Sequence, residues 1–388
     1  MKILITPEAN TAETAGSIVR TSAVAMAAIN NGHEVAFCAG DDINYVNIEG
    51  IRKYFSDIPS PVGLPKILGR PVYQLYKLSG IQKRESVNDY EMIFHFIGLS
   101  NKTFFKNDVE NVRKAIRDFK PDIVFTEHRL SPIVAARLEN VKVVTTYSLL
   151  IHKSFDSPNY GKYSSGVAKY LEDLDLPCIK SILDLYRWTD ANFVPSSYDI
   201  EPIDAEKIHY IGPLIDYSRI KPRGESRNNI VVYLGNSGFT PNEIIKTMTK
   251  TFADTKWNVF ITSKEMKKSN NKNITIAPYF DFNELLANAF LFISHGGQNS
   301  LMQGLIYGVP MISFPGGVYE RRFNSMTMEK LHSGKLLEND DFTSEKILST
   351  IKEFEVDTSY AENAVNAGKS LMKLGGASKI IEIMENLL

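Results

Sequence analysis

The sequence has little cysteine, little tryptophan and no long apolar run. Cys38 and Cys178 are the two cysteines among 388 residues, too few for a disulfide framework or a four-cysteine zinc site. The N-terminal stretch MKILITPEAN turns polar after KILIT, so it lacks the apolar core of a signal peptide. No apolar run approaches the roughly 18 residues that a membrane-spanning helix needs. These absences predict a cytoplasmic protein without a transmembrane segment.

An excess of charge of either sign is also missing. Lys and Arg total 44 and Asp and Glu total 45, which gives a net charge of -1. Proteins that coat nucleic acid need many cations to neutralise phosphates, and recruitment to an anionic membrane needs basic clusters. We therefore expect no nucleic-acid partner. A peripheral position at the inner membrane face stays open as the alternative to a free cytoplasmic one.

Short apolar runs alternate with amphipathic stretches along the whole chain. The runs in the first half include KILIT, EVAFCAG, DIVFTE and KVVTTY, and those in the second half include NIVVYLG, WNVFITS, NITIAPY, LFIS and VPMISF. Runs rich in β-branched residues that do not alternate with polar ones are typical of parallel strands covered on both faces. The sequence therefore predicts an α/β protein with two Rossmann-like, doubly wound parallel sheets.

A composition change divides the chain. The apolar IGPLI ends the first half, and the polar stretch IDYSRIKPRGESRNN follows it, as expected for an exposed linker. We predict a first domain over residues 1–215, a linker over 216–228 and a second domain over 229–388, whose last helix could pack back on the first domain. The alternative is a long surface loop within one domain. Residues of about 50–110 break the pattern and predict an irregular insertion, which either shapes a ligand pocket or serves packing.

The stretch from Leu291 to Ser325 carries the strongest chemical signal. A buried run ends at Ser294, His295-Gly296-Gly297 form a tight turn, and a helix begins near Gln298 or Asn299. Glycines let backbone approach a ligand closely, and the start of a helix attracts anions. Because open parallel sheets bind ligands beyond the carboxyl ends of their strands, we expect a phosphate near Gly297 to Ser300. A purely structural turn is the alternative.

The same stretch resembles the C-terminal signature of nucleotide-sugar glycosyltransferases with the GT-B fold, those of the UDP-glycosyltransferase (inverting, family-1-like) type. The matching residues are His295-Gly296-Gly297, Ser300, Gln303-Gly304, Gly308-Val309-Pro310, Glu320-Arg321 and Asn324. Upstream, APYFDFNELLANA resembles the family's nucleobase segment, VVYLGNSG its phosphate loop and IGPLI its interdomain junction. The resemblance implies two Rossmann-like domains that face a cleft, with the donor bound mainly by the second.

The resemblance also implies the donor-binding residues. Those expected at the diphosphate are Gly235, Asn236, Ser237, His295, Gly297, Gln298, Asn299 and Ser300. Those expected at the base, ribose and sugar are Ile276, Ala277, Tyr279, Gln303, Glu320 and Arg321. Ile276 stands where some relatives have a ring-stacking tryptophan, and Arg321 stands where the family has a neutral amide, so the donor sugar stays open.

The reaction that the resemblance implies is inverting transfer of a sugar from a UDP or dTDP sugar to an acceptor hydroxyl. The acceptor would be a small molecule or natural product, or an apolar or lipid-linked compound. Asp173-Leu174-Asp175 lies in a helix-like polar stretch rather than in a metal-binding setting, so we expect neither a metal nor a cofactor.

The catalytic base departs from the family. The family's histidine aligns with Ser17, and a serine is too weak a base without a partner. Glu13, Glu127 and His128 are the candidates to replace it. Two rival interpretations remain: a catalytically silent GT-B protein that binds a sugar nucleotide or a partner, and a non-hydrolysing nucleotide-sugar epimerase.

Overall fold

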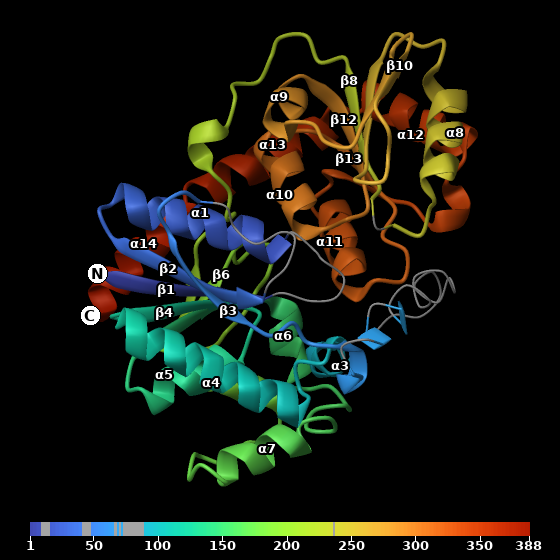
Figure 1. The fold of residues 1–388 in the computed structure, drawn as a ribbon. Coiled ribbons are helices and arrows are strands. Elements are labelled where there is room, and N and C mark those ends of the chain that lie inside the picture. Colours follow the sequence, from blue (N-terminus) through green and yellow to red (C-terminus); the bar gives the residue numbers. More distant parts are fainter. Residues whose placement is uncertain (9–15, 41–47, 66–67, 70, 73–88, 236) are drawn as a thin grey trace. The chain divides into compact units, whose positions relative to one another are not determined.

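The computed structural model describes all residues except 9–15, 41–47, 66–67, 70, 73–88 and 236 (Figure 1). The described residues form two compact units, each built around one sheet. Unit 1 comprises the described residues up to Ile215 together with Leu374–Leu388, and unit 2 comprises Asp216–Lys373 with its one gap. The chain thus passes from unit 1 to unit 2 after Ile215 and returns after Lys373.

Unit 1 contains a seven-stranded sheet in the order β3-β2-β1-β4-β5-β6-β7, with all described pairings parallel. Its strands are β1 (Lys2–Pro7), β2 (Glu34–Gly40), β3 (Arg52–Ser56), β4 (Ile123–Glu127), β5 (Lys142–Thr146), β6 (Ala191–Val194) and β7 (Ile208–Tyr210). Its helices are α1 (Gly16–Asn30), α3 (Tyr90–Ile97), α4 (Lys102–Phe119), α5 (Ser131–Leu138), α6 (Leu149–Ser154), α7 (Ser165–Glu172) and α14 (Gly376–Leu387).

Helices cover both faces of this sheet, with α1 and α14 on one side and α4 and α5 on the other (Figure 1). The apolar strands supply one half of the core, and the apolar stripes of α1 and α14 supply the other. Ile380, Ile381 and Met384 of α14 are buried in the same cluster as Ile3 and Phe125. Each such side chain contributes about 1.5–3 kcal/mol when fully buried, which fixes the last helix to unit 1.

Unit 2 repeats the architecture with the order β10-β11-β9-β8-β12-β13-β14. Its strands are β8 (Asn229–Tyr233), β9 (Asn258–Thr262), β10 (Ser269–Asn271), β11 (Ile274–Ala277), β12 (Ala289–Ser294), β13 (Met311–Ser313) and β14 (Gly334–Leu336). β10 runs antiparallel to β11, and the other described pairings are parallel. Its helices are α8 (Pro241–Phe252), α9 (Phe282–Ala287), α10 (Gln298–Ile306), α11 (Tyr319–Lys330), α12 (Ser344–Val356) and α13 (Ser359–Met372).

The two predicted Rossmann-like parallel sheets are therefore confirmed. Local sequence explains where helices begin. Thr240 caps α8 and exchanges hydrogen bonds with Glu243 in a capping box, a motif that satisfies otherwise unpaired N–H groups.

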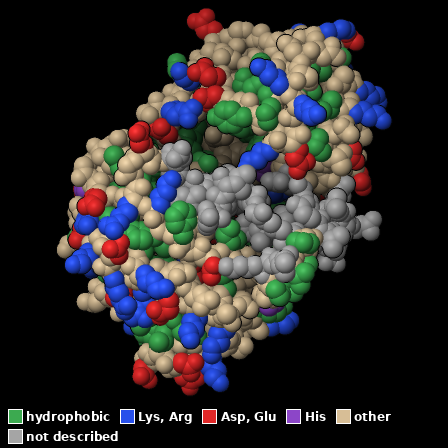
Figure 2. Space-filling view, viewed as in Figure 1, with side chains coloured by type: hydrophobic (Ala, Val, Ile, Leu, Met, Phe, Trp, Pro, Cys, Tyr) green, Lys and Arg blue, Asp and Glu red, His purple; other side chains and the backbone are tan. Residues whose placement is uncertain are grey.

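Charged side chains of both signs are interspersed on the face shown in Figure 2, in keeping with the balanced composition. Within the parts of the chain that the structure describes, no helix combines the length and apolarity that crossing a bilayer requires.

Candidate functional site

The strands of the second sheet end together at one edge. Their paired last residues run Ala277, Thr262, Tyr233, Ser294 and Ser313 across β11, β9, β8, β12 and β13. β8 is the first strand of the unit along the chain, and in the sheet it lies between β9 on one side and β12 on the other. The strand order therefore reverses between β8 and β12, which is the position where such sheets bind ligands.

The predicted turn lies at this reversal point. Gly296 has φ +79°, a left-handed conformation that glycine adopts without steric cost. Gly297 then occupies the N-cap position of α10 with extended backbone, so the first N–H groups of the helix receive no bond from a capping side chain. Ser300 is buried in the first turn, whereas Gln298 and Asn299 are half-buried. This arrangement presents backbone donors and a positive helix end beyond the sheet.

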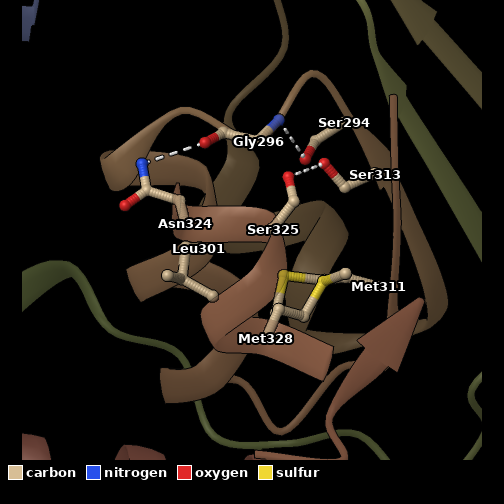
Figure 3. Close-up of a pocket in the computed structure, with 8 residues that line it drawn as sticks. All are labelled: Ser294, Gly296, Leu301, Met311, Ser313, Asn324, Ser325 and Met328. Atoms are coloured by element: carbon tan, nitrogen blue, oxygen red, sulfur yellow. Dashed lines mark hydrogen bonds between the residues drawn. The ribbon is translucent and has the colours of Figure 1, made fainter. Parts of the chain in front are cut away.

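The turn is held from behind by α11 and β13 (Figure 3). Asn324 donates its side-chain amide to the Gly296 carbonyl at 3.0 Å, and the Gly296 N–H donates to Ser294 Oγ at 3.2 Å. Ser313 and Ser325 share a hydroxyl hydrogen bond of 2.5 Å behind the loop. A Cβ on Gly296 would lie 2.5 Å from Ser325 Oγ, so only glycine fits here.

His295 is buried beside this turn. Its Nδ1 lies 3.4 Å from the Tyr233 carbonyl, and its ring meets the Tyr233 ring edge-on, with centroids 5.1 Å apart. Burial, together with the charge of Arg321, lowers the pKa of His295 to about 3. The imidazole is therefore neutral at pH 7, and an anion bound nearby would offset the field of Arg321.

The other predicted donor residues lie along the same edge. Gly235 and Ser237 follow β8, and Asn236 lies outside the described residues. Ile276 and Ala277 are buried at the end of β11, whereas 73% of Tyr279, two residues further on, is exposed. Two further predicted residues sit on neighbouring helices: Gln303 in α10 and Glu320 in the first turn of α11, beside Arg321.

The first sheet gathers a second set of predicted residues at its own reversal point. β1 lies between β2 and β4, and Pro7 is paired with Glu127 at the strand ends. Ser17, in the first turn of α1, accepts a hydrogen bond of 3.0 Å from the Glu8 N–H. His128 directly follows Glu127. Glu13 lies outside the described residues.

Two arginines at this edge are absent from the sequence-based prediction. Arg20 binds Glu127 through Nε at 2.6 Å and through its terminal nitrogen at 2.5 Å. Arg129 forms a buried bidentate pair with Asp108, at 2.8 and 2.5 Å. One signal could have found Arg20: it lies one helical turn after Ser17, on the same side of α1.

Among the described residues, no three His, Cys, Asp or Glu side chains gather as a metal site would require.

Comparison with known proteins agrees with the geometry. Residues 232–387 match the family model described as "Erythromycin biosynthesis protein CIII-like, C-terminal domain". An uncharacterized glycosyltransferase of Methanosarcina mazei is 25% identical over 293 residues, which cover 71% of this chain and 75% of the relative.

Solved structures share the fold over the whole chain. The glycotransferase of kitacinnamycin superposes with a TM-score of 0.74 at 16% identity and covers 100% of this chain and 99% of its own. The glycosyltransferase VinC in complex with DTDP superposes with a TM-score of 0.69 at 15% identity, with coverages of 100% and 99%.

Two doubly wound parallel-sheet units, the glycine turn and these matches show a glycosyltransferase of the GT-B class. Its motifs resemble those of the UDP-glycosyltransferase, family-1-like type, and this resemblance is confirmed.

Proposed function

We propose that this glycosyltransferase moves a sugar from a nucleoside-diphosphate sugar to an acceptor hydroxyl, with inversion at the sugar carbon and without a metal ion. The observation that carries the proposal is the turn from His295 into α10 at the reversal point of the second sheet. A diphosphate placed there would meet the N–H groups of the helix start. The charge that develops on the leaving diphosphate would be stabilised by fixed dipoles, which is usually the largest catalytic contribution.

Each donor residue has a proposed role. Gln298, Asn299 and Ser300 bind the diphosphate from one side, and Gly235 to Ser237 bind it from the other. The charge of Arg321, which reaches His295, takes the place that a divalent cation has in other phosphate sites.

The remaining donor residues act further along the same edge. Ile276, Ala277 and Tyr279 receive the base, Gln303 the ribose and Glu320 the sugar. The donor is of the UDP or dTDP type, and the DTDP in the VinC structure supports the second.

Calorimetric titration with UDP, dTDP and their glucose derivatives tests the donor site. Arg321→Met should weaken diphosphate binding about 10- to 100-fold, since a charge-assisted hydrogen bond contributes about 1.5–3 kcal/mol. Arg322→Met is the matched control, because the neighbouring guanidinium pairs with Glu338 at 2.9 Å at the surface. Failure of all four nucleotides to bind would contradict the proposal.

Turnover tests the reaction. We expect the enzyme to glycosylate a phenol, and to do so also in the presence of a chelator. The anomeric configuration of the product should be opposite to that of the donor. Donor binding without release of nucleoside diphosphate would instead indicate the silent protein that Ser17 suggests. An epimer formed from the donor alone would indicate an epimerase.

A further inference from the structure

The polar residues at the carboxyl edge of the first sheet differ in how well their side chains can act as a base. The side chain of Glu127 is fully buried, and its Oε1 binds Arg20 at 2.5 and 2.6 Å. That oxygen is engaged and cannot meet a substrate hydroxyl. Ser17 is 8% exposed, and its hydroxyl accepts the Glu8 N–H; its oxygen is also a weak base. His128, by contrast, carries an imidazole, the side chain that most often acts as a general base near neutral pH.

His128 stands directly against the buried carboxylate. Its Nε2 lies 3.7 Å from Glu127 Oε1, and its ring is nearly parallel to that of Tyr90, with centroids 5.9 Å apart and planes inclined by 16°. The other carboxylate oxygen, Glu127 Oε2, is buried without a hydrogen-bond partner among the described residues. Since an unpaired buried carboxylate oxygen is costly, a positive charge on the neighbouring imidazole would lessen that cost.

The backbone at His128 is strained, with φ +52°. Residues other than glycine rarely adopt this conformation, which costs of order 1 kcal/mol and concentrates at functional sites. Ion pairs on both sides hold it. Glu127 is fixed by Arg20, while Arg129 is bound by Asp108 and donates to the Cys38 carbonyl at 2.6 Å. The residues before and after His128 are thus both anchored, which limits how its ring can move.

We propose that His128 is the general base of the transfer and that Glu127 and Arg20 are positioning residues. The inference rests on the proposed function. Glu127 favours the imidazole proton on Nε2. Nδ1, which is buried in the structure, would then take the acceptor's hydroxyl proton once the bound acceptor reaches it. The acceptor oxygen then bonds to the sugar carbon, the carbon–oxygen bond to the diphosphate breaks, and its electron pair leaves with the diphosphate. The imidazolium is stabilised by Glu127 and afterwards loses its proton to water.

This assignment differs from the family pattern, in which the histidine stands at the start of the helix after the first strand. Here Ser17 occupies that position, and Arg20, one turn later, takes up the carboxylate at the end of β4. The orienting acid is therefore the last residue of β4, and the base is the residue that follows it.

The decisive variant is His128→Asn, because asparagine tolerates the left-handed conformation and cannot act as a base. The assay measures nucleoside diphosphate release from UDP-glucose or dTDP-glucose with 4-methylphenol and with 4-nitrophenol. If neither phenol is glycosylated, the assay measures hydrolysis of the donor by water instead. The variant should lose about 10²- to 10⁴-fold in kcat with 4-methylphenol but less than about tenfold with 4-nitrophenol, which is largely ionised at about pH 8 and needs no base. For hydrolysis the full loss is expected.

His332→Gln is the control, because this histidine lies in unit 2 and pairs at the surface with Asp357. It should leave kcat unchanged. Glu13→Gln, made in parallel, should also retain turnover.

Two further variants separate positioning from structural support. Glu127→Gln removes an anion beside the imidazole and should move the acidic limb of the kcat/KM profile to lower pH. Arg20→Gln removes a cation from the same group and should move that limb to higher pH, whereas Arg20→Lys should restore most of the wild-type profile. If the two variants only damaged the fold, their melting temperatures would fall, but their pH profiles would not shift in opposite directions.

The outcomes are distinct. Wild-type-like kcat in His128→Asn, or an equal loss with both phenols, overturns this inference while donor binding and wild-type turnover preserve the proposed function. A loss in Glu13→Gln equal to that expected for His128→Asn also overturns it. A wild-type protein that releases no nucleoside diphosphate overturns both.

Discussion

Replacing Gly296 by alanine should damage both the stability of unit 2 and its donor site. The new Cβ would lie 2.5 Å from Ser325 Oγ, 2.8 Å from Ser313 Oγ and 2.9 Å from the Arg321 carbonyl. The serine hydroxyls bond each other and cannot both turn away, and the carbonyl belongs to the backbone of α11. The turn must therefore move toward the position where the diphosphate is proposed to bind.

The cost has two parts. A left-handed backbone costs an alanine about 1–2 kcal/mol, and overpacking a well-packed site typically costs about 1–3 kcal/mol more. We expect Gly296→Ala to lower the free energy of unfolding by about 3 kcal/mol. Gly32→Ala isolates the first part, because Gly32 has φ +77° and no atom lies within 4 Å of the position that its added methyl group would take. It should cost about 1 kcal/mol.

The two tryptophans allow each unit to be followed separately by fluorescence during urea unfolding. Trp257 stacks on Phe290 in unit 2, and Trp188 lies in unit 1 beside Arg137. Gly296→Ala is measured in a protein with Trp188→Phe, so that the fluorescence reports unit 2. Gly32→Ala is measured in a protein with Trp257→Phe, so that it reports unit 1. Equal losses in the two glycine variants, or unchanged dTDP affinity in Gly296→Ala, would refute the close packing behind the turn as the reason for this glycine.

Three other perturbations have expected outcomes. The burial that lowers the pKa of His295 to about 3 means that the unfolded state binds more protons between about pH 6.5 and 3. The stability that the neutral, buried imidazole permits is fully present above about pH 6.5 and is lost as the pH falls through this window. His295→Gln should therefore reduce the slope of the unfolding free energy against pH, within the window, by about 1.4 kcal/mol per pH unit. An unchanged slope would contradict this. Asp108→Ala leaves the buried Arg129 unpaired and should destabilise unit 1 by about 3–5 kcal/mol, and a loss below about 1 kcal/mol would show that water reaches the guanidinium. Thr240→Ala removes the cap of α8 and should cost unit 2 about 1 kcal/mol, measured by urea unfolding, with no change in donor affinity.

The repeating apolar runs predict most of the fold because buried parallel strands need almost no polar residues. Strand β3 is different: its residues RKYFS are half-buried or exposed at a sheet edge, so the segment reads as part of an irregular insertion over about 50–110. The start of α9 shows a similar limit. Asp281 and Glu284 have the spacing of a capping box, but Asp281 alone caps the helix, while Glu284 pairs with Lys221.

The donor turn is predictable because its residues lie close together in the sequence. The contacts around Glu127 are not, because Arg20 and Glu127 are 107 positions apart, and a single sequence carries no sign of which charges meet. Asp108 illustrates the same point: it lies in the amphipathic α4 and reads as a solvated residue, yet it is fully buried.

The return of α14 to unit 1 determines how the molecule can be dissected. A fragment that begins at Asp216 and runs to the C-terminus would carry Ile380, Ile381 and Met384 without the strands and α1 that cover them, and it should aggregate through this uncovered apolar stripe. A fragment that stops at Lys373 avoids the problem, whereas the remaining half needs Leu374–Leu388 supplied as a peptide or a fusion to complete its core.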